Sequence, residues 1–200
     1  MKRLFLTLSL ALVALASSHA QDVSATELER ARSYLQKTSE AFLASVAGLS
    51  DAQLNFKPAP TRWSVAEVSE HIAATEDFLF GNVQNVMKAP ARTEPANLKE
   101  IDDFVVAAIS DRASKAQAPE PLIPTMRFGS AAGSTGHFKE SRVKTIAFLN
   151  GTKDLRAHAV DSPLGRKLDA YQWILFMAAH SERHTKQINE VKADPSFPMK

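Results

Sequence analysis

Apolar residues recur at helical spacing along most of the chain. A capping box at residues 24–27 opens the first such stretch, because its serine side chain and its glutamate can reciprocally satisfy free amides at a helix start. The spacing predicts a helix over about residues 24–47 that ends at Gly48, and residues 50–54 predict one short turn of helix. The apolar positions of the first helix are Leu28, Ala31, Leu35, Phe42 and Val46.

Two further helices follow a proline-containing break at residues 58–60. A second capping box, at residues 64–67, predicts a helix that continues to about residue 87. Its inward stripe is expected to consist of Val68, His71, Thr75 and Phe78. A third helix is expected from about Asn97, with a buried side formed by Ile101, Phe104, Val105, Ala108 and Ile109.

A long segment without helical spacing comes next. Prolines and glycines predict an irregular loop over residues 115–136, and they lie at Pro119, Pro121, Pro124, Gly129, Gly133 and Gly136. Long loops of compact domains often lie over a functional site, and a mobile surface linker is the alternative. The helical pattern resumes at Phe138, is interrupted at residues 150–151, and restarts briefly through His158.

The last long helix is predicted over about residues 167–193, after a turn at residues 162–165. The sequence contains neither strand-like alternation with hairpin turns nor an internal repeat. The pattern therefore predicts an all-α fold, an up-down four-helix bundle with a long loop and short additional helices.

The first twenty residues differ from the rest. Lys2 and Arg3 precede an apolar run over residues 4–16, and small residues at Ser18 and Ala20 follow it. This pattern is typical of a secretory signal, here cleaved before residue 21. The alternative is an uncleaved anchor, but a run of thirteen residues falls short of the roughly 20 that a spanning helix needs. We therefore expect a signal peptide at residues 1–20, one domain at residues 21–200, and a periplasmic or secreted protein.

Composition and charge narrow the class of partner. An apolar fraction of 44% suffices for one sizeable core. Lys2 and Arg3 carry the whole formal excess of charge, since 24 basic residues minus these 2 equal the 22 acidic ones. A neutral mature chain gives no electrostatic reason to bind nucleic acid or, after signal cleavage, a membrane. The absence of cysteine excludes disulfides, thiolate ligands and a cysteine nucleophile, so a metal site must use histidine and carboxylate.

Three histidines are the candidate chemistry. His180 and His184 are four residues apart, so their side chains lie one turn apart on one helix face. That face is otherwise apolar, with Trp173, Phe176, Met177, Ile188 and Val191. His71 has a similar inward position on an earlier helix. Buried imidazoles need partners, and one divalent ion would satisfy all three. The alternative is three separate core histidines bonded to the backbone or to carboxylates.

Other polar candidates are weaker. His19 lies in the signal peptide, while His137 and His158 are expected at the surface. Glu67, one turn before His71, is a candidate general base or a hydrogen-bond partner of the metal ligands, but its place in a capping box already explains it. Glu182 is expected to point away from the histidine face, toward solvent or toward Arg183 beside it. The two tryptophans, Trp63 and Trp173, are expected to pack in the core.

Two segments of the chain resemble the signature regions of the DinB superfamily. One is residues 63–68 leading to His71, and the other is residues 169–173 leading to residues 180–184 and then 187–188. This resemblance spans essentially the whole mature chain. It implies a four-helix bundle in which one histidine of the second helix and a spaced pair of the last bind nickel, zinc or a similar ion. It also implies S-transferase or isomerase chemistry on a small thiol.

Three imidazoles leave a divalent ion with its full charge and at least one open position, which is typical of catalytic sites. A bound water would have a lowered pKa, or a thiolate or carboxylate could occupy the position. We expect a metal-dependent hydrolase or thiol S-transferase acting on an unknown small molecule. A non-catalytic metal-binding or stress-related bundle and a purely structural bundle are the alternatives. Zinc or nickel is expected first, iron or copper also fit, and pairing into a homodimer stays open.

Overall fold

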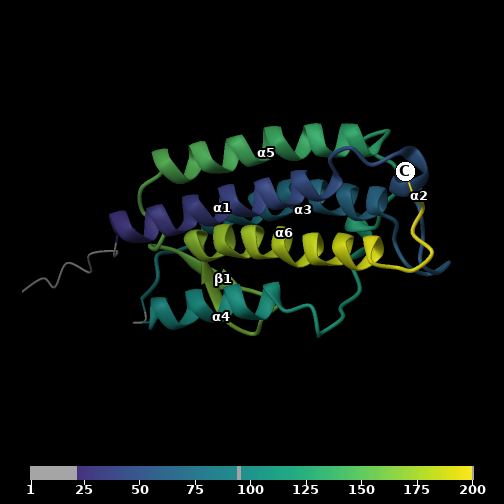
Figure 1. The fold of residues 1–200 in the computed structure, drawn as a ribbon. Helices are drawn as coiled ribbons and strands as arrows, with labels where there is room; N and C mark the ends of the chain where they lie inside the picture. The colour runs from purple at the N-terminus through teal and green to yellow at the C-terminus, as the bar shows by residue number, and fades with distance from the viewer. Residues whose placement is uncertain (1–21, 94–95, 200) are drawn as a thin grey trace, which may run out of the picture.

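A computed structural model describes residues 22–93 and 96–199, so the predicted signal peptide lies outside the described residues. Four long helices form a bundle: α1 (Ala25–Val46), α3 (Val65–Val86), α5 (Ala131–Gly151) and α6 (Ala170–Lys192) (Figure 1). Shorter elements are α2 (Asp51–Asn55), α4 (Leu98–Ser110), the 3-10 turn η1 (Glu120–Leu122), and strands β1 (Ala159–Asp161) and β2 (Lys167–Asp169). The four-helix bundle predicted from the sequence is confirmed.

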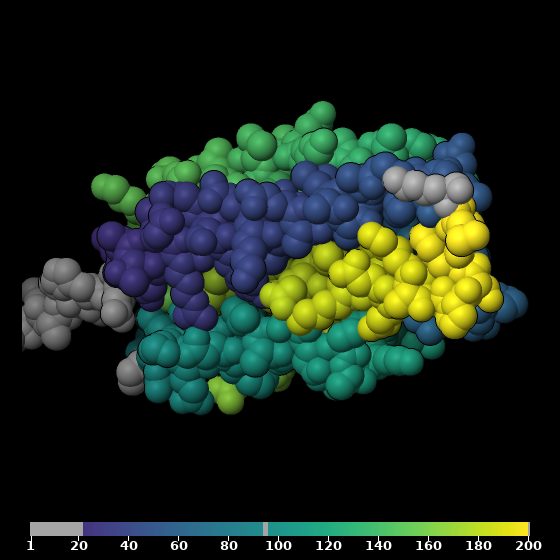
Figure 2. All heavy atoms as spheres, in the orientation of Figure 1, coloured from purple at the N-terminus to yellow at the C-terminus, as the bar shows by residue number. Residues whose placement is uncertain are grey.

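Helix α4 lies outside the bundle. It packs against α6, and Figure 2 shows α1, α6 and α4 side by side on one face of the molecule. Among the described residues, no helix is both long enough and apolar enough to cross a membrane.

Reciprocal hydrogen bonds begin the helices where the sequence predicts them. Both predicted capping boxes form, at Ser24 with Glu27 and at Ser64 with Glu67. In each box the serine oxygen accepts from the glutamate N–H, and the glutamate carboxylate accepts from the serine N–H. The start of each helix is thereby fixed by local sequence. A third box fixes the start of α6, with Asp169 as the N-cap.

The four long helices run in two parallel pairs. Near the ends of α1 and α6, Lys192 donates to the carbonyl of Ser45 at 2.8 Å. Near the ends of α3 and α5, the rings of Phe80 and Phe148 meet edge to face at 5.3 Å. Along the chain the helices therefore run up, down, down and up (Figure 1), so the alternating up-down order predicted from the sequence was wrong, although the four-helix bundle itself was right. The long crossover that carries α4 permits this order, because it returns the chain to the end of the bundle where α3 began.

A buried ion pair lies between the two apolar clusters of the core. Arg142 of α5 donates to both carboxylate oxygens of Glu76 on α3, at 3.0 and 2.5 Å. It also donates to the Leu35 carbonyl and to the hydroxyls of Thr38 and Ser181. All five N–H groups of the guanidinium are used, so the charge is buried without an unpaired donor.

A second buried arginine fixes the start of α6. Arg156 donates to both oxygens of Asp102 on α4 at 2.8 and 2.7 Å, to Asp169 at 3.1 Å and to Glu27 at 2.6 Å. Its guanidinium also lies 4.0 Å from the ring centre of Tyr171. These contacts join α1, α4 and α6, and they hold α6 in the orientation from which it presents its histidines.

Helix α5 begins earlier than the glycines of residues 129–136 suggested. The prediction of an irregular loop to residue 136 was wrong at its end, because Ser130 caps a helix that starts at Ala131. Gly133 is needed there, since a Cβ at this position would lie 2.1 Å from the carbonyl oxygen of Phe128. The close approach of the preceding segment at Phe128 therefore explains this glycine, despite the low helix propensity of the residue type.

Two smaller predictions also fail. Residues 152–158 form turns rather than a brief helix, and they lead into an antiparallel hairpin of β1 and β2 that the sequence did not predict. Strands of three residues are too short to produce a period-two pattern. Phe78, predicted in the inward stripe of α3, is 44% exposed. Thr75 and Leu79 are among the buried residues of this part of α3.

Candidate metal centre

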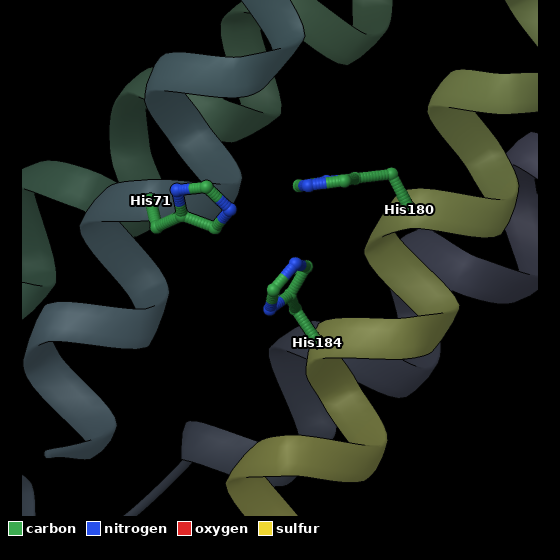
Figure 3. A group of neighbouring side chains, drawn as sticks. All are labelled: His71, His180 and His184. Atoms are coloured by element: carbon green, nitrogen blue, oxygen red, sulfur yellow. The ribbon is translucent and has the colours of Figure 1, made fainter. Parts of the chain in front are cut away.

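The three predicted histidines converge between α3 and α6. His71 comes from α3 and His180 and His184 come from α6, and Figure 3 shows the three rings facing a common space. One ligand nitrogen from each lies within 4.8 Å of the other two. The ring centres are 5.0 Å apart for His71 and His180, 4.5 Å for His71 and His184, and 4.3 Å for His180 and His184. This group could hold one metal ion.

Hydrogen bonds orient two of the three rings. The Nδ1 of His71 lies 2.8 Å from the carbonyl oxygen of Leu122 in η1. A carbonyl can only accept, so this nitrogen carries the proton and Nε2 carries the lone pair. The Nδ1 of His184 lies 2.8 Å from Oε1 of Gln187, one turn later on α6. Within the described part of the chain, the Nε2 atoms of these two rings have no hydrogen-bond partner, which fits a shared cation.

The protein environment keeps the three imidazoles neutral. Burial is the main cause that lowers the pKa of each, and for His184 it lowers the pKa to about 3. Repulsion between the rings adds to the effect for His180 and His184. His71 and His184 are buried residues, and His180 is half-buried. Neutral imidazole is the form that binds a metal ion.

Comparisons with known proteins agree with the fold and the histidine pattern. The family described as the DinB superfamily matches residues 34–188. The chain belongs to the DinB superfamily. The Bacillus subtilis (strain 168) protein named "Uncharacterized protein YuaE" is 31% identical over 146 residues, which cover 72% of this chain and 86% of that protein.

A solved DinB-like structure supports the same fold. YfiT from Bacillus subtilis aligns with a TM-score of 0.59 over 88% of this chain and 91% of its own, at 14% identity. YfiT is described as "a probable metal-dependent hydrolase with an unusual four-helix bundle topology". At this identity the likeness establishes the fold, and the chemistry must be argued from the site.

No carboxylate joins the three histidines in the described part of this DinB protein. The carboxylate of Glu67 accepts from the Ser64 N–H at 2.7 Å and from Lys57 at 2.9 Å, so its capping role is confirmed. Glu182 points away from the histidine face, as predicted, but it pairs with Tyr34 and Lys186 rather than with Arg183. The polar groups of the site are therefore imidazoles.

The loop between α4 and α5 lies over the site, as one of the two interpretations of residues 115–136 proposed. Besides the Leu122 contact, the turn at residues 125–127 binds Glu70, the neighbour of His71 on α3. Burial would raise the pKa of Glu70, but hydrogen bonds from Thr125, Arg127 and Met126 outweigh it and lower the pKa. Sequence spacing could not reveal Leu122 or Glu70, because one acts through its backbone and the other resembles any polar helix residue.

The two other histidines of the described residues, His137 and His158, lie outside the three-histidine group. His137 is only partly exposed, bonds Asp77 at 2.6 Å and stacks on a phenylalanine, which makes it a link between α3 and α5. His158 is half-buried beside the hairpin.

Trp173 is buried in the core as predicted. Trp63 is less buried than predicted, and its ring centre lies 4.9 Å from that of His71, so it forms one wall of the site. His19 lies outside the described residues.

The clearest surface hollows lie elsewhere. Two, of about 520 and 310 Å³, are lined mainly by residues of α1 and α5, and neither contains any of the three histidines. Both hollows are therefore separate from the three-histidine group.

Proposed function

We propose that this DinB protein is a metal-dependent hydrolase that holds one divalent ion through His71, His180 and His184. The convergence of three neutral imidazoles, with ligand nitrogens within 4.8 Å of one another, carries this proposal. Three protein ligands are typical of a catalytic site, whereas structural sites are closed by four ligands.

The chemistry of the ligand set favours hydrolysis. A divalent ion held only by neutral ligands keeps its full charge, so it would lower the pKa of a coordinated water and polarise a substrate oxygen. The chain itself orients the ligands, with Leu122 fixing His71 and Gln187 fixing His184. Trp63 supplies an apolar wall beside His71. The Glu67 carboxylate is engaged by its helix cap and by Lys57, so it does not serve as the general base.

The description of YfiT as a probable metal-dependent hydrolase supports the same class of reaction through a shared fold. Thiol transfer is the other chemistry of the superfamily, and an exported chain would be separated from cytoplasmic thiol cofactors. Export, proposed from residues 1–20, therefore favours hydrolysis. N-terminal sequencing of the secreted or periplasmic fraction checks the signal, and a mature protein that starts at Met1 would contradict it.

Elemental analysis tests the metal site. The purified wild-type protein should contain about one equivalent of zinc or nickel, as one three-histidine site would bind. The variant His180→Ala, His184→Ala should contain none. His137→Ala, which removes a histidine outside the site, should retain the metal. Equal substoichiometric metal in the wild-type protein and the double variant would refute the site.

Two assays then separate the classes of function. A hydrolase should cleave members of a panel of small esters and amides, and a chelator or the double histidine variant should abolish this cleavage. In a cobalt-substituted sample, a visible-spectrum change on adding glutathione would favour thiol transfer instead. Metal binding without either response would favour the non-catalytic alternative.

A further inference from the structure

The Glu70 carboxylate is enclosed by a turn of the loop over the site. It accepts from the backbone N–H groups of Thr125, Met126 and Arg127 at 2.7, 2.7 and 3.2 Å. Met126 has a φ of 62°, which is the left-handed region that non-glycine residues rarely adopt. Successive N–H groups in such a turn form a concave anion-binding nest. Here the anion is a side chain of α3, so the turn is bound to the helix rather than to a ligand.

The Arg127 side chain extends this contact to the residues around Leu122. Its Nε donates to Glu70 at 3.1 Å, while its two terminal nitrogens donate to the carbonyls of Pro121 at 2.8 Å and Ile123 at 2.7 Å. Those two carbonyls flank Leu122 on both sides in the sequence. One planar guanidinium therefore ties the backbone around Leu122 to the Glu70 carboxylate.

The Leu122 carbonyl is hydrogen-bonded to His71, the residue that follows Glu70 on α3. It accepts from Nδ1 of His71 at 2.8 Å. Glu70 and His71 are consecutive residues of α3, so the anchor of the loop and the group that the loop orients share one rigid helix turn. Leu122 is itself buried.

We propose that Glu70 and Arg127 are positioning residues that hold the Leu122 carbonyl against His71 and thereby keep the imidazole in the tautomer with Nε2 free for a metal ion. The proposal rests on the proposed metal-dependent function. A loop that merely covers the site would not need the Arg127 guanidinium to bind the carbonyls on both sides of Leu122. It would also not need its carboxylate anchor, Glu70, to lie beside His71 on the same turn of α3. Outer partners of metal-binding histidines typically change metal affinity by about 10- to 100-fold when removed.

The test combines histidine tautomers with zinc affinity. Nitrogen-15 NMR of the metal-free protein reports which ring nitrogen of His71 carries the proton, with His71→Gln to assign the signal. Competition with a chelator gives the dissociation constant for zinc. Glu70→Gln should shift His71 toward a mixture of tautomers and weaken zinc binding about 10-fold or more. Arg127→Lys should act similarly, because an ammonium keeps the charge but cannot bridge a carboxylate and two carbonyls.

Two controls separate positioning from general stability. Asp77→Asn removes another α3 carboxylate that binds α5 through His137 and Ser141, and it should leave the His71 tautomer unchanged. His184 should also keep its tautomer in every variant, because Gln187 on its own helix orients it. Combining Glu70→Gln with Arg127→Lys should weaken zinc binding by less than the product of the single effects. Both substitutions disrupt the same hydrogen-bonded connection between Glu70 and the backbone around Leu122, so their effects should not be independent.

Two results would overturn the proposal. One is an unchanged His71 tautomer and zinc affinity in both single variants, and the other is a tautomer change at His184 as large as at His71. If the wild-type protein binds neither zinc nor nickel, the proposed function fails, while the tautomers of the metal-free protein still decide whether Glu70 and Arg127 orient His71.

Discussion

Acidification should destabilise the metal-stripped protein between pH 7 and pH 5, because folding buries imidazoles that must stay neutral. His184 illustrates the magnitude, since burial lowers its pKa from 6.5 to about 3. At pH 5 the unfolded chain holds a proton on this residue and the folded chain does not. The unfolded state then gains about 2 kcal/mol relative to the folded state from this one side chain.

The sign follows from the direction of the shift. A lowered pKa in the folded state means that the unfolded state binds more protons below pH 6.5, so stability is complete above that value and is lost as the pH falls. The pKa values of His71 and His180 are lowered too, and they act in the same direction. Carboxylates with lowered pKa titrate below their ordinary values of 4.5 and 3.8, outside the chosen range.

Asp169 acts in the opposite direction and requires a control. Burial raises its pKa to about 6, so the folded state takes up a proton there before the unfolded state does. This uptake offsets part of the histidine effect as the pH falls from 6 to 5. Comparing the wild-type protein with His184→Gln cancels the Asp169 contribution, because that carboxylate is present in both.

The assay is urea unfolding with a chelator present, followed by circular dichroism at pH 7.5, 6.5, 5.5 and 5.0. The wild-type protein should lose about 2 kcal/mol more than His184→Gln across this range. Parallel profiles for the two proteins would show that His184 is not buried as a neutral imidazole, and the reasoning about the site would fail with it.

Glu76→Leu should lower the free energy of unfolding by about 3–5 kcal/mol, because Arg142 would stay buried and unpaired. Adding Arg142→Leu should recover most of this loss in urea titrations. If the losses of the two single variants add instead, the ion-pair argument is contradicted. Gly133→Ala should lower the melting temperature, because its Cβ would clash with the backbone of Phe128. A Cβ at Gly136 meets nothing within 4 Å, so Gly136→Ala should raise the free energy of unfolding by about 0.5–1 kcal/mol. Equal shifts of the two variants in calorimetry would refute the early start of α5. Zinc at about 100 times its dissociation constant should stabilise the protein by about 2.7 kcal/mol, and His71→Ala should abolish this gain in thermal melts.

Much of the fold could be predicted because its signals are local. The capping boxes at Ser24 and Ser64 mark helix starts within four residues of chain, and the structure forms both. The start of α5 could not be predicted in this way, because Gly133 reads as a helix breaker until the Phe128 carbonyl beside it is known. The exposure of Phe78 was equally hidden, since the spacing of α3 does not say which neighbours cover it.

The helical class, the two helices that carry the histidines, and the three residues that could converge all follow from local patterns of the sequence. A four-residue spacing places His180 and His184 on one helix face wherever that helix lies. The groups that complete the site depend on how the chain folds, because their contacts join residues some fifty positions apart: Leu122 with His71, and the turn at residues 125–127 with Glu70. A backbone carbonyl has no sequence signature, and the role of a carboxylate depends on which amides the fold brings to it.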